Sequence, residues 1–294
     1  MRGAQHGKHA GMWAAAVVVL NAVCAAGQAP VTTRVYKTVA GTNLALHIFR
    51  PAEQSVGSRL PGIVFFHGGG WTQGTPAQFF PQSRYLAGRG MVAISVEYRI
   101  QSRHGTTPRE SLQDAKSALR WVRRNADELG LDPQRIAAAG GSAGGHLAAA
   151  LACVTAFDEP GEDASVSPRP DALVLFNPVI DQSPGGWGHG EVSSYWRSFS
   201  PLHNIASNMP PTLFMVGTKD DFLPLPTAEE FRKKMAAAGA RCELRLYPGA
   251  GHGFFNYRDG RNRHYYVTLL EMDTFLSALG WLRGKPSLTI PEGL

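Results

Sequence analysis

The sequence predicts an α/β fold with a sheet of about eight strands, mostly parallel, and helices on both faces. Short runs typical of strands alternate along the chain with amphipathic or Ala/Leu-rich runs typical of helices. In the middle of the chain, residues 140–144 read Gly-Gly-Ser-Ala-Gly between a strand-like run and a helical run. This pattern indicates a sharp strand–turn–helix that lifts a serine hydroxyl above the sheet.

The first elements after residue 30 predict a β-hairpin. Residues 31–39 and 44–50 alternate apolar and polar side chains, and Gly-Thr-Asn at residues 41–43 lies between them. Residues 63–66 are wholly apolar, which is typical of a buried central strand, and the glycine-rich segment 67–71 follows directly.

The next part of the chain predicts helix, strand and helix. A helix over residues 78–87 is closed by glycines, and a strand covers residues 91–98. After a polar loop, residues 111–129 predict an amphipathic helix, because apolar residues recur there at steps of three and four. They are Leu112, Ala115, Leu119 and Val122.

The second half of the chain repeats this alternation. The apolar run 136–139 precedes the serine, and the Ala/Leu-rich run 147–152 predicts the helix behind it. The remaining predicted strands are residues 172–176, 212–217 and 243–247, and the remaining helices are residues 227–238 and 265–282. Residues 181–211 are the longest stretch without clear periodicity.

Composition indicates one large globular domain. The chain has 294 residues, of which 44% are hydrophobic and 18% are charged. The formal net charge of +6 is spread without a dense Lys/Arg run, so no nucleic-acid partner is expected. No residue set has the spacing of a metal site or a cofactor motif, so neither a metal nor a cofactor is expected.

The N-terminus reads as a secretory signal over residues 1–27. Arg2 and Lys8 precede the apolar run 12–20, which is too short to span a bilayer, and small residues follow at 25–27. An uncleaved interfacial anchor is the alternative. The mature protein is therefore expected to be exported, periplasmic or secreted, without a stable membrane span.

The expected domain layout is a catalytic domain over residues 31–284 and a polar C-terminal tail over residues 285–294. Of three cysteines, Cys24 would leave with the signal. Cys153 and Cys242 lie in regular apolar elements, which favours two buried thiols, although two cysteines of an exported protein can also pair.

Ser142 needs two partners to act as a nucleophile. A base must take the proton of the hydroxyl, and an acid must orient that base. In this architecture the order along the chain is serine, acid, histidine. Asp220 and Asp221 follow the strand 212–217, and His252 lies in a glycine-rich loop after the last strand. The residues themselves leave both aspartates open as the acid.

Acyl transfer also requires hydrogen-bond donors for an oxyanion. His-Gly-Gly-Gly at residues 67–70 follows the third strand, where glycines let backbone N–H groups point inward. Ala143, the residue after the serine, supplies a further N–H at the start of a helix.

Five motifs together carry a family resemblance that covers residues 31–282. They are HGGGW (67–71), EYR (97–99), LDPQRIAAAGGSAGGHLAAAL (131–151), GTKDDFLP (217–224) and GAGHGFFN (249–256). They resemble the α/β-hydrolase carboxylesterases of the hormone-sensitive-lipase type, and more narrowly exported bacterial acetyl-esterase and feruloyl-esterase-like members.

The resemblance implies an α/β-hydrolase fold, serine carboxylesterase activity and a role for each candidate residue. Ser142 becomes the nucleophile and His252 the base. The family pattern G-T-x-D, with proline four residues later, falls on Asp220 and selects it as the acid. The oxyanion donors become Gly69, Gly70 and Ala143.

Two departures from the family weaken any transfer of lipid specificity. The segment before the third strand is too short for the long N-terminal cap that these enzymes usually carry. Gly141 stands where many members have aspartate before the serine.

The substrate is the least determined feature. We expect Trp71, Trp187, Tyr195 and Trp196 to contact substrate, because flat aromatic rings suit sugar faces, although these rings can equally pack the loop. The predicted reaction is hydrolysis of short-chain acyl esters, acetyl or feruloyl, on plant polysaccharides. The alternatives are a prolyl-oligopeptidase-type serine peptidase, a general lipase or esterase without carbohydrate preference, and a catalytically inactive hydrolase fold.

Overall fold

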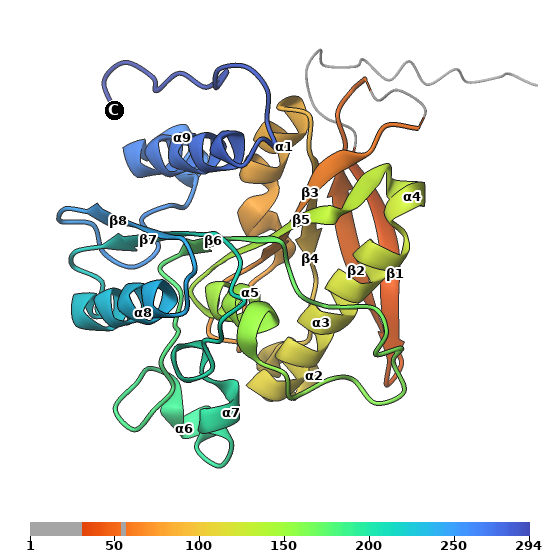
Figure 1. The fold of residues 1–294 in the computed structure, drawn as a ribbon, viewed down its shortest axis with the longest axis vertical. Coiled ribbons are helices and arrows are strands. Elements are labelled where there is room, and N and C mark those ends of the chain that lie inside the picture. Colours follow the sequence, from red (N-terminus) through yellow and green to blue (C-terminus); the bar gives the residue numbers. More distant parts are fainter. Residues whose placement is uncertain (1–30, 54–56) are drawn as a thin grey trace, which may run out of the picture.

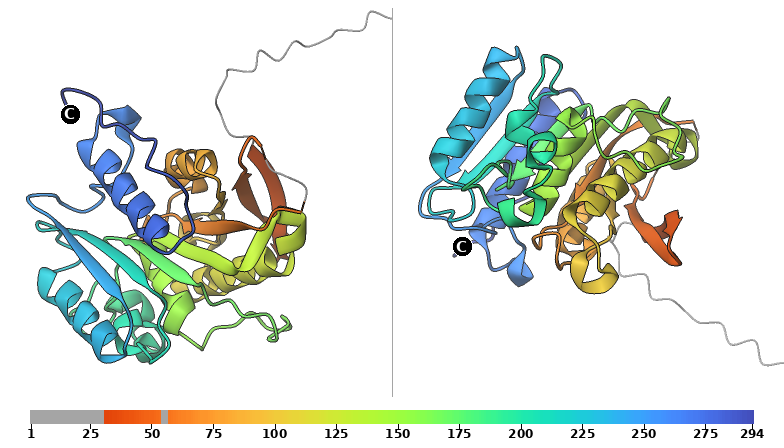
Figure 2. Two further views of the ribbon diagram at one scale, coloured as in Figure 1. Left: turned by 45° about the horizontal axis from the view of Figure 1, so that its top comes forward. Right: turned by 90° about the horizontal axis from the view of Figure 1, so that it is seen from below.

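The computed structural model describes residues 31–53 and 57–294. The predicted signal, residues 1–27, lies outside these ranges and stays a prediction. The described chain contains one sheet of eight strands in the order β1-β2-β4-β3-β5-β6-β7-β8 (Figure 1). Helices α1 and α9 cover one face of the sheet, and α3, α5 and α8 cover the other (Figures 1 and 2). The predicted fold class is confirmed.

The strands follow the predicted order. β1 and β2 form the antiparallel hairpin, β2 is antiparallel to β4, and every later pair in the sheet is parallel. The bounds are β1 Val31–Val39, β2 Thr42–Phe49, β3 Leu60–Phe66, β4 Val92–Val96, β5 Leu131–Gly141, β6 Ala172–Phe176, β7 Thr212–Gly217 and β8 Cys242–Tyr247. Because β3 and β5 to β8 are parallel, the loops after them meet at one edge of the sheet.

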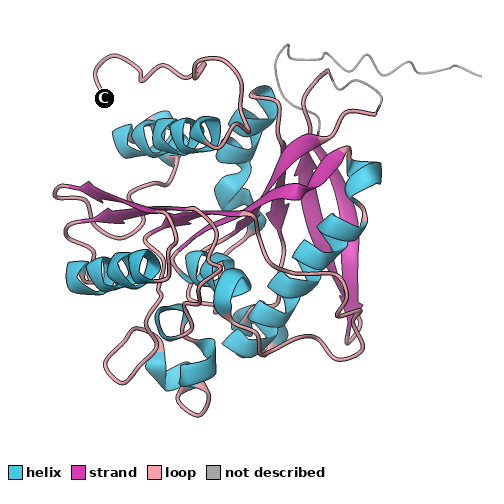
Figure 3. Ribbon diagram, in the orientation of Figure 1, coloured by secondary structure: helices cyan, strands magenta, loops and turns pink. Residues whose placement is uncertain are grey.

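The helices, cyan in Figure 3, begin and end at residues that differ from prediction by a few positions. Their bounds are α1 Phe80–Gly88, α2 Gln101–His104, α3 Pro108–Arg124, α4 Ala126–Leu129, α5 Ala143–Cys153, α6 His189–Val192, α7 Trp196–Phe199, α8 Leu225–Ala237 and α9 Arg263–Ala278. The predicted helix 111–129 begins earlier, because Thr107 and Glu110 form a capping box, and it is interrupted at Asn125. The aperiodic segment 181–211 contains two short helices, α6 and α7.

The core lies in two layers, one on each face of the sheet. Strand β3 illustrates the alternation: Val64 and Phe66 pack in one layer with α3, α5 and α8, and Ile63 and Phe65 pack in the other with α1 and α9. All four side chains are fully buried, which explains the continuous apolar run in the sequence.

Cys153 and Cys242 are free thiols, and both are partly buried. Burial raises the pKa of each thiol to about 12, so neither is a reactive thiolate at neutral pH. Within the described ranges, no helix combines the length and hydropathy needed to cross a bilayer.

Candidate active site

Ser142 occupies a strained turn between β5 and α5. Its φ of 55° is positive, which is unusual for a residue other than glycine and marks a strained backbone. The glycines on both sides are required by close packing. A Cβ added at Gly140 would lie 2.3 Å from the Gly144 oxygen, and one added at Gly144 would lie 2.0 Å from the Phe66 oxygen. The small residues in the motif therefore allow the sharp turn that exposes the hydroxyl.

A chain of hydrogen bonds joins the three residues that the sequence placed on separate loops. His252 Nε2 lies 2.8 Å from Ser142 Oγ. His252 Nδ1 lies 2.9 Å from both carboxylate oxygens of Asp220. With Nδ1 donating to the carboxylate, Nε2 carries the lone pair that can accept the serine proton.

Asp220, and not Asp221, holds the histidine. The Asp220 side chain is fully buried, and its Oδ1 also accepts hydrogen bonds from the backbone N–H of Phe222 at 2.9 Å and of Leu223 at 3.0 Å. Asp221 is exposed and faces a neighbouring pocket. The turn after β7 therefore orients only the first of the two adjacent carboxylates toward His252.

The glycine-rich loop after β3 leaves two N–H groups available for an oxyanion. The N–H of Gly68 is already engaged, because it donates to Gln78 Oε1 at 2.6 Å. Among residues 31–53 and 57–294, no acceptor is hydrogen-bonded to the N–H of Gly69, Gly70 or Ala143. Ala143 begins helix α5, where the first N–H groups have no partner within the helix.

A cavity of about 390 Å³ opens over Ser142. Among the residues that the structure describes, only Glu191 and, when protonated, His252 bring charge to its wall. The lining residues are Gly68, Gly69, Gly70, Thr72, Gln73, Gln78, Ser142, Asn177, Trp187, Glu191, Phe222, His252, Gly253, Phe255 and Asn256. The serine, the histidine and both glycine donors therefore face one volume, into which an ester can enter.

Comparison with known proteins gives the family. The family model described as BD-FAE matches residues 46–184, and the model described as alpha/beta hydrolase fold matches residues 192–256. Carboxylesterase NlhH of Mycobacterium tuberculosis is 30% identical over 238 residues, which is 74% of this chain and 72% of NlhH. The chain belongs to the α/β-hydrolase carboxylesterases of the hormone-sensitive-lipase type.

Two further relatives are informative. The match to esterase LipC of M. tuberculosis, 34% identical, covers 66% of this chain but only 53% of LipC, so this carboxylesterase spans about half of that relative. The apo form of esterase 2 from Thermogutta terrifontis is 45% identical, with a TM-score of 0.83, and the match covers 88% of this chain and 97% of that one. Butyrate-bound and propionate-bound structures of the same esterase also match.

Of the four aromatic residues expected to contact substrate, Trp71 and Trp187 lie side by side, with 5.4 Å between their ring centroids, but only Trp187 lines the Ser142 cavity. Trp71 is 1% exposed and lines an adjoining cavity of about 240 Å³ instead.

Tyr195 and Trp196 line neither of these two cavities, and their contact with substrate stays a prediction. The Tyr195 ring packs against Phe157 and Phe199, and the Trp196 ring packs edge-on against His203. The Tyr195 ring thus packs on the loop that follows α5, and the Trp196 ring packs within segment 181–211 itself.

Three of the cavity-wall residues that sequence reasoning missed are Asn177, Phe222 and Glu191. Asn177 follows β6 directly, and its position at the carboxyl end of a parallel strand was an available signal. Phe222 packs edge-on against the His252 ring with 4.6 Å between ring centroids. Glu191 lines both cavities. Phe222 lies inside the GTKDDFLP motif, but no pattern in the sequence indicated a role for its ring or for Glu191.

In the part of the chain that the structure describes, no cluster of three His, Cys, Asp or Glu side chains could hold a metal ion.

Proposed function

We propose that this carboxylesterase hydrolyses short-chain carboxylic esters through an acyl-enzyme intermediate on Ser142. The supporting observation is the continuous hydrogen-bonded chain from Ser142 Oγ through His252 to Asp220. A carboxylate, an imidazole and a hydroxyl in this order make a neutral serine nucleophilic at neutral pH.

In the first step, Ser142 Oγ attacks the ester carbonyl carbon while its proton passes to His252 Nε2. The carbonyl oxygen gains negative charge and accepts hydrogen bonds from the N–H groups of Gly69, Gly70 and Ala143. The bond between carbon and the alcohol oxygen then breaks. His252 returns the proton to the leaving alcohol, and the acyl group remains on Ser142.

In the second step, water takes the place of the alcohol. His252 Nε2 accepts a proton from the water as its oxygen attacks the acyl carbon, and the same donors hold the oxyanion. The bond to Ser142 Oγ breaks, and the proton moves from His252 to the serine. Asp220 remains ionised throughout and stabilises the imidazolium that forms in each step.

The surroundings of the donors support a short acyl group. A Cβ added at Gly70 would lie 3.2 Å from Trp187 Cη2, so the Trp187 ring stands against the oxyanion loop. The Phe222 and Phe255 rings line the same cavity. The butyrate and propionate found in the related T. terrifontis esterase are of the acyl size that we propose for this chain.

We further propose that acetyl or feruloyl esters on plant polysaccharides are among the substrates. Trp187 presents a ring in the cavity, and four amide side chains accompany it. Hydroxyl groups of a sugar can bond to such amides while a sugar face stacks on a ring. The amides are Gln73, Gln78, Asn177 and Asn256.

The test is product release by the purified chain, with Ser142→Ala as the control. The substrates are p-nitrophenyl acetate, p-nitrophenyl decanoate, methyl ferulate and acetylated xylan, together with a prolyl peptide substrate for the peptidase alternative. We expect turnover of acetate esters, weak turnover of decanoate, and acetate release from xylan. Turnover of the peptide, or full activity in Ser142→Ala, would contradict the proposal. Activity on small synthetic esters alone would remove only its carbohydrate part.

A further inference from the structure

Asn177 is placed against Ser142 by the backbone on both sides of it. Phe176, the residue before it, accepts a hydrogen bond from the Ser142 N–H at 3.0 Å. Val179, two residues after it, donates to the Ser142 carbonyl oxygen at 3.2 Å. The short segment that carries Asn177 is therefore tied at two points to the backbone of the nucleophile.

The backbone of Asn177 is strained, and its side chain is fully buried. Its φ is 34°, which is a positive value like that of Ser142. Its own N–H donates to the Met215 oxygen at 2.8 Å and so continues the pairing of β6 with β7. Strained non-glycine residues persist where the surrounding structure holds them, and they cluster at functional sites.

The amide group of Asn177 lies against the His252 ring. Nδ2 is 3.3 Å from His252 Nδ1 and 3.2 Å from His252 Nε2. In the ring plane these nitrogens already face Asp220 and Ser142. Because Cε1 lies between the two nitrogens in that plane, an atom equally close to both must lie toward a face of the ring.

The amide oxygen of Asn177 makes no hydrogen bond that would stabilise the fold among the described residues. Asn177 Oδ1 is buried and has no hydrogen-bond partner there. A buried polar atom without a partner costs roughly 1–3 kcal/mol. An apolar side chain of the same shape would avoid this cost, so the fold alone does not explain an amide at this position.

We propose that Asn177 is a positioning residue for His252. Its amide covers one face of the imidazole ring and keeps the ring in line between Asp220 and Ser142. This inference rests on the proposed role of His252 as the base.

Few charged groups lie close to the His252 ring. Asp220 contacts the ring at Nδ1, and Glu191 is the one acidic residue that lines the Ser142 cavity in the described chain. Lys and Arg side chains are absent from the lining formed by the described residues. A new charge at position 177 would therefore act on His252 without a nearby cation to neutralise it.

The first test is Asn177→Asp, which keeps the shape and replaces the amide with a carboxylate. A negative charge against the ring stabilises the imidazolium, so the pKa of His252 rises. Below neutral pH, kcat/KM falls as His252 becomes protonated, and this fall is the acid limb of the pH profile. We expect the acid limb to move to higher pH by about 1 to 2 units. NMR titration of the His252 ring protons, assigned with a His252→Ala variant, should move by the same amount.

The second test is Asn177→Gly, which removes the amide and accepts the positive φ without strain. On p-nitrophenyl acetate we expect kcat to fall about tenfold or more with KM nearly unchanged. This ester has no sugar hydroxyl that the amide could bind, so the loss reports the misaligned base. Circular dichroism checks that both variants are folded.

Asn256→Asp is the matched control for Asn177→Asp, because Asn256 lines the same cavity but bonds to Gln78 and not to His252. It should shift the acid limb less than Asn177→Asp.

The outcomes separate this inference from the proposed function. An unchanged acid limb and an unchanged His252 titration in folded Asn177→Asp would overturn the inference, as would wild-type kcat in Asn177→Gly. Full activity in Ser142→Ala would instead overturn the proposed function, and the NMR titration would still report whether Asn177 acts on the His252 ring.

Discussion

The Phe255 ring fills the space that a side chain at Gly141 would need. A Cβ added to Gly141 would lie 2.3 Å from Phe255 Cζ. The ring is fixed there by other aromatic side chains, with centroids 4.8 Å from that of Phe176 and 5.6 Å from that of Phe79. The glycine before Ser142 is thus matched in space by a phenylalanine three residues after His252.

Gly141→Asp should therefore destabilise the protein by about 3 kcal/mol, because the new side chain overlaps a ring that cannot easily move. Urea denaturation followed by circular dichroism measures this loss. Phe255→Ala alone should cost about 3 kcal/mol through the cavity it leaves. The loss measured for the double variant should be smaller than the sum of the two single-variant losses by about 1 kcal/mol or more. Strict additivity would show that Phe255 is not what excludes a side chain at position 141.

The two adjacent aspartates should respond very differently to removal of their charge. Asp220→Asn should lower kcat by about ten-thousand-fold, because an amide cannot hold His252 in the tautomer that accepts the serine proton. Asp221→Asn should leave kcat within about twofold of wild type, because its side chain is exposed and turned away. Steady-state kinetics on p-nitrophenyl acetate decides the assignment, and the opposite ranking would transfer the role to Asp221.

The sequence was informative wherever a local pattern is a direct consequence of the backbone. Continuous apolar runs marked the buried strands, and the glycines around Ser142 marked a turn in which two backbones approach closely. The order of serine, aspartate and histidine placed the candidates at one edge of a parallel sheet, and the structure brings them within hydrogen-bond distance.

The sequence was uninformative where a role depends on contacts between distant segments. Tyr195 and Trp196 have the composition of a substrate-binding loop, but Phe157 and His203 determine where their rings pack. Asn177 and Glu191 carry no motif, and only the folded chain brings them to the cavity.

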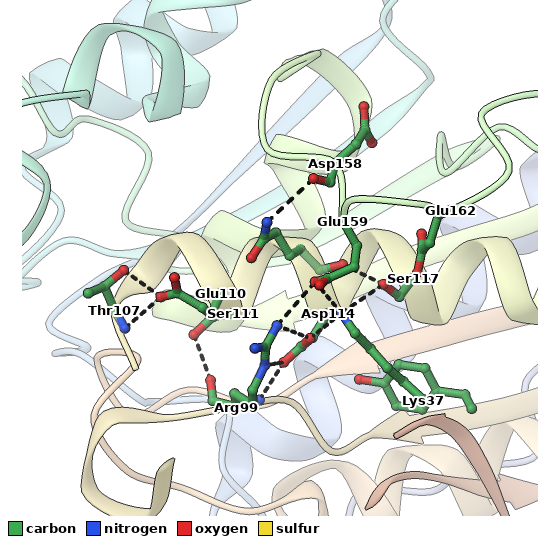
Figure 4. Close-up of polar contacts among 12 residues, drawn as sticks. Lys37, Arg99, Thr107, Glu110, Ser111, Asp114, Ser117, Asp158, Glu159 and Glu162 are labelled. Carbon is green, nitrogen blue, oxygen red and sulfur yellow. Dashed lines mark hydrogen bonds and ion pairs between the residues drawn. The ribbon is translucent and has the colours of Figure 1, made fainter. Parts of the chain in front are cut away.

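A buried ion cluster links β1 to α3, to the segment after β4 and to the loop after α5 (Figure 4). The Asp114 side chain is fully buried and bonds to Lys37 Nζ at 2.6 Å and to Arg99 Nε and NH2, each at 2.8 Å. Glu159 supplies the second carboxylate, at 2.6 Å from Lys37 and 3.2 Å from Arg99. Two cations and two carboxylates therefore balance.

Asp114→Asn should destabilise the protein by about 3–5 kcal/mol, because it leaves two buried cations with one carboxylate. Urea denaturation at neutral pH measures the loss. The control is Asp127→Asn, whose side chain is 87% exposed and pairs with an exposed Arg59 at 3.2 Å. It should change stability by less than about 1 kcal/mol. Equal effects of the two substitutions would contradict a structural role for the cluster.

Stability should fall as the pH is lowered below about 6.5. Burial lowers the pKa of His146 to about 3 and that of His67 to about 4. Between these values and about 6.5, the unfolded chain binds a proton at each histidine and the folded chain does not. The free energy of unfolding therefore falls with decreasing pH, by about 1.4 kcal/mol per unit for each group.

From pH 7 to pH 5, these two histidines should together lower the free energy of unfolding by about 4 kcal/mol. His146→Gln removes one of them and should lose about 2 kcal/mol less over the same interval. Urea denaturation at the two pH values gives both numbers. The quantity to compare is the change in the free energy of unfolding between pH 7 and pH 5 in each protein. The absolute stability of the variant does not enter this comparison. Equal losses for wild type and His146→Gln would mean that burial of His146 does not disfavour its protonation.

Glu191 should select against anionic esters. Its side chain is exposed, and it is the single acidic lining residue of both the Ser142 cavity and the adjoining cavity in the described chain. No ion pair neutralises its carboxylate within residues 31–53 and 57–294. An ester with a carboxylate in its acyl group would therefore enter a cavity of the same sign of charge.

Glu191→Gln should raise kcat/KM for mono-p-nitrophenyl glutarate, relative to neutral p-nitrophenyl butyrate, by about three- to tenfold at low salt. The gain should shrink in 1 M NaCl, where exposed charges are screened over about 3 Å. Asp127→Asn removes one negative charge far from the cavity and should leave the ratio unchanged. If Glu191→Gln and Asp127→Asn gave the same ratio, overall net charge and not Glu191 would govern selectivity. If the ratio in Glu191→Gln rose equally at both salt concentrations, the shape of the new side chain, and not its lost charge, would be the cause.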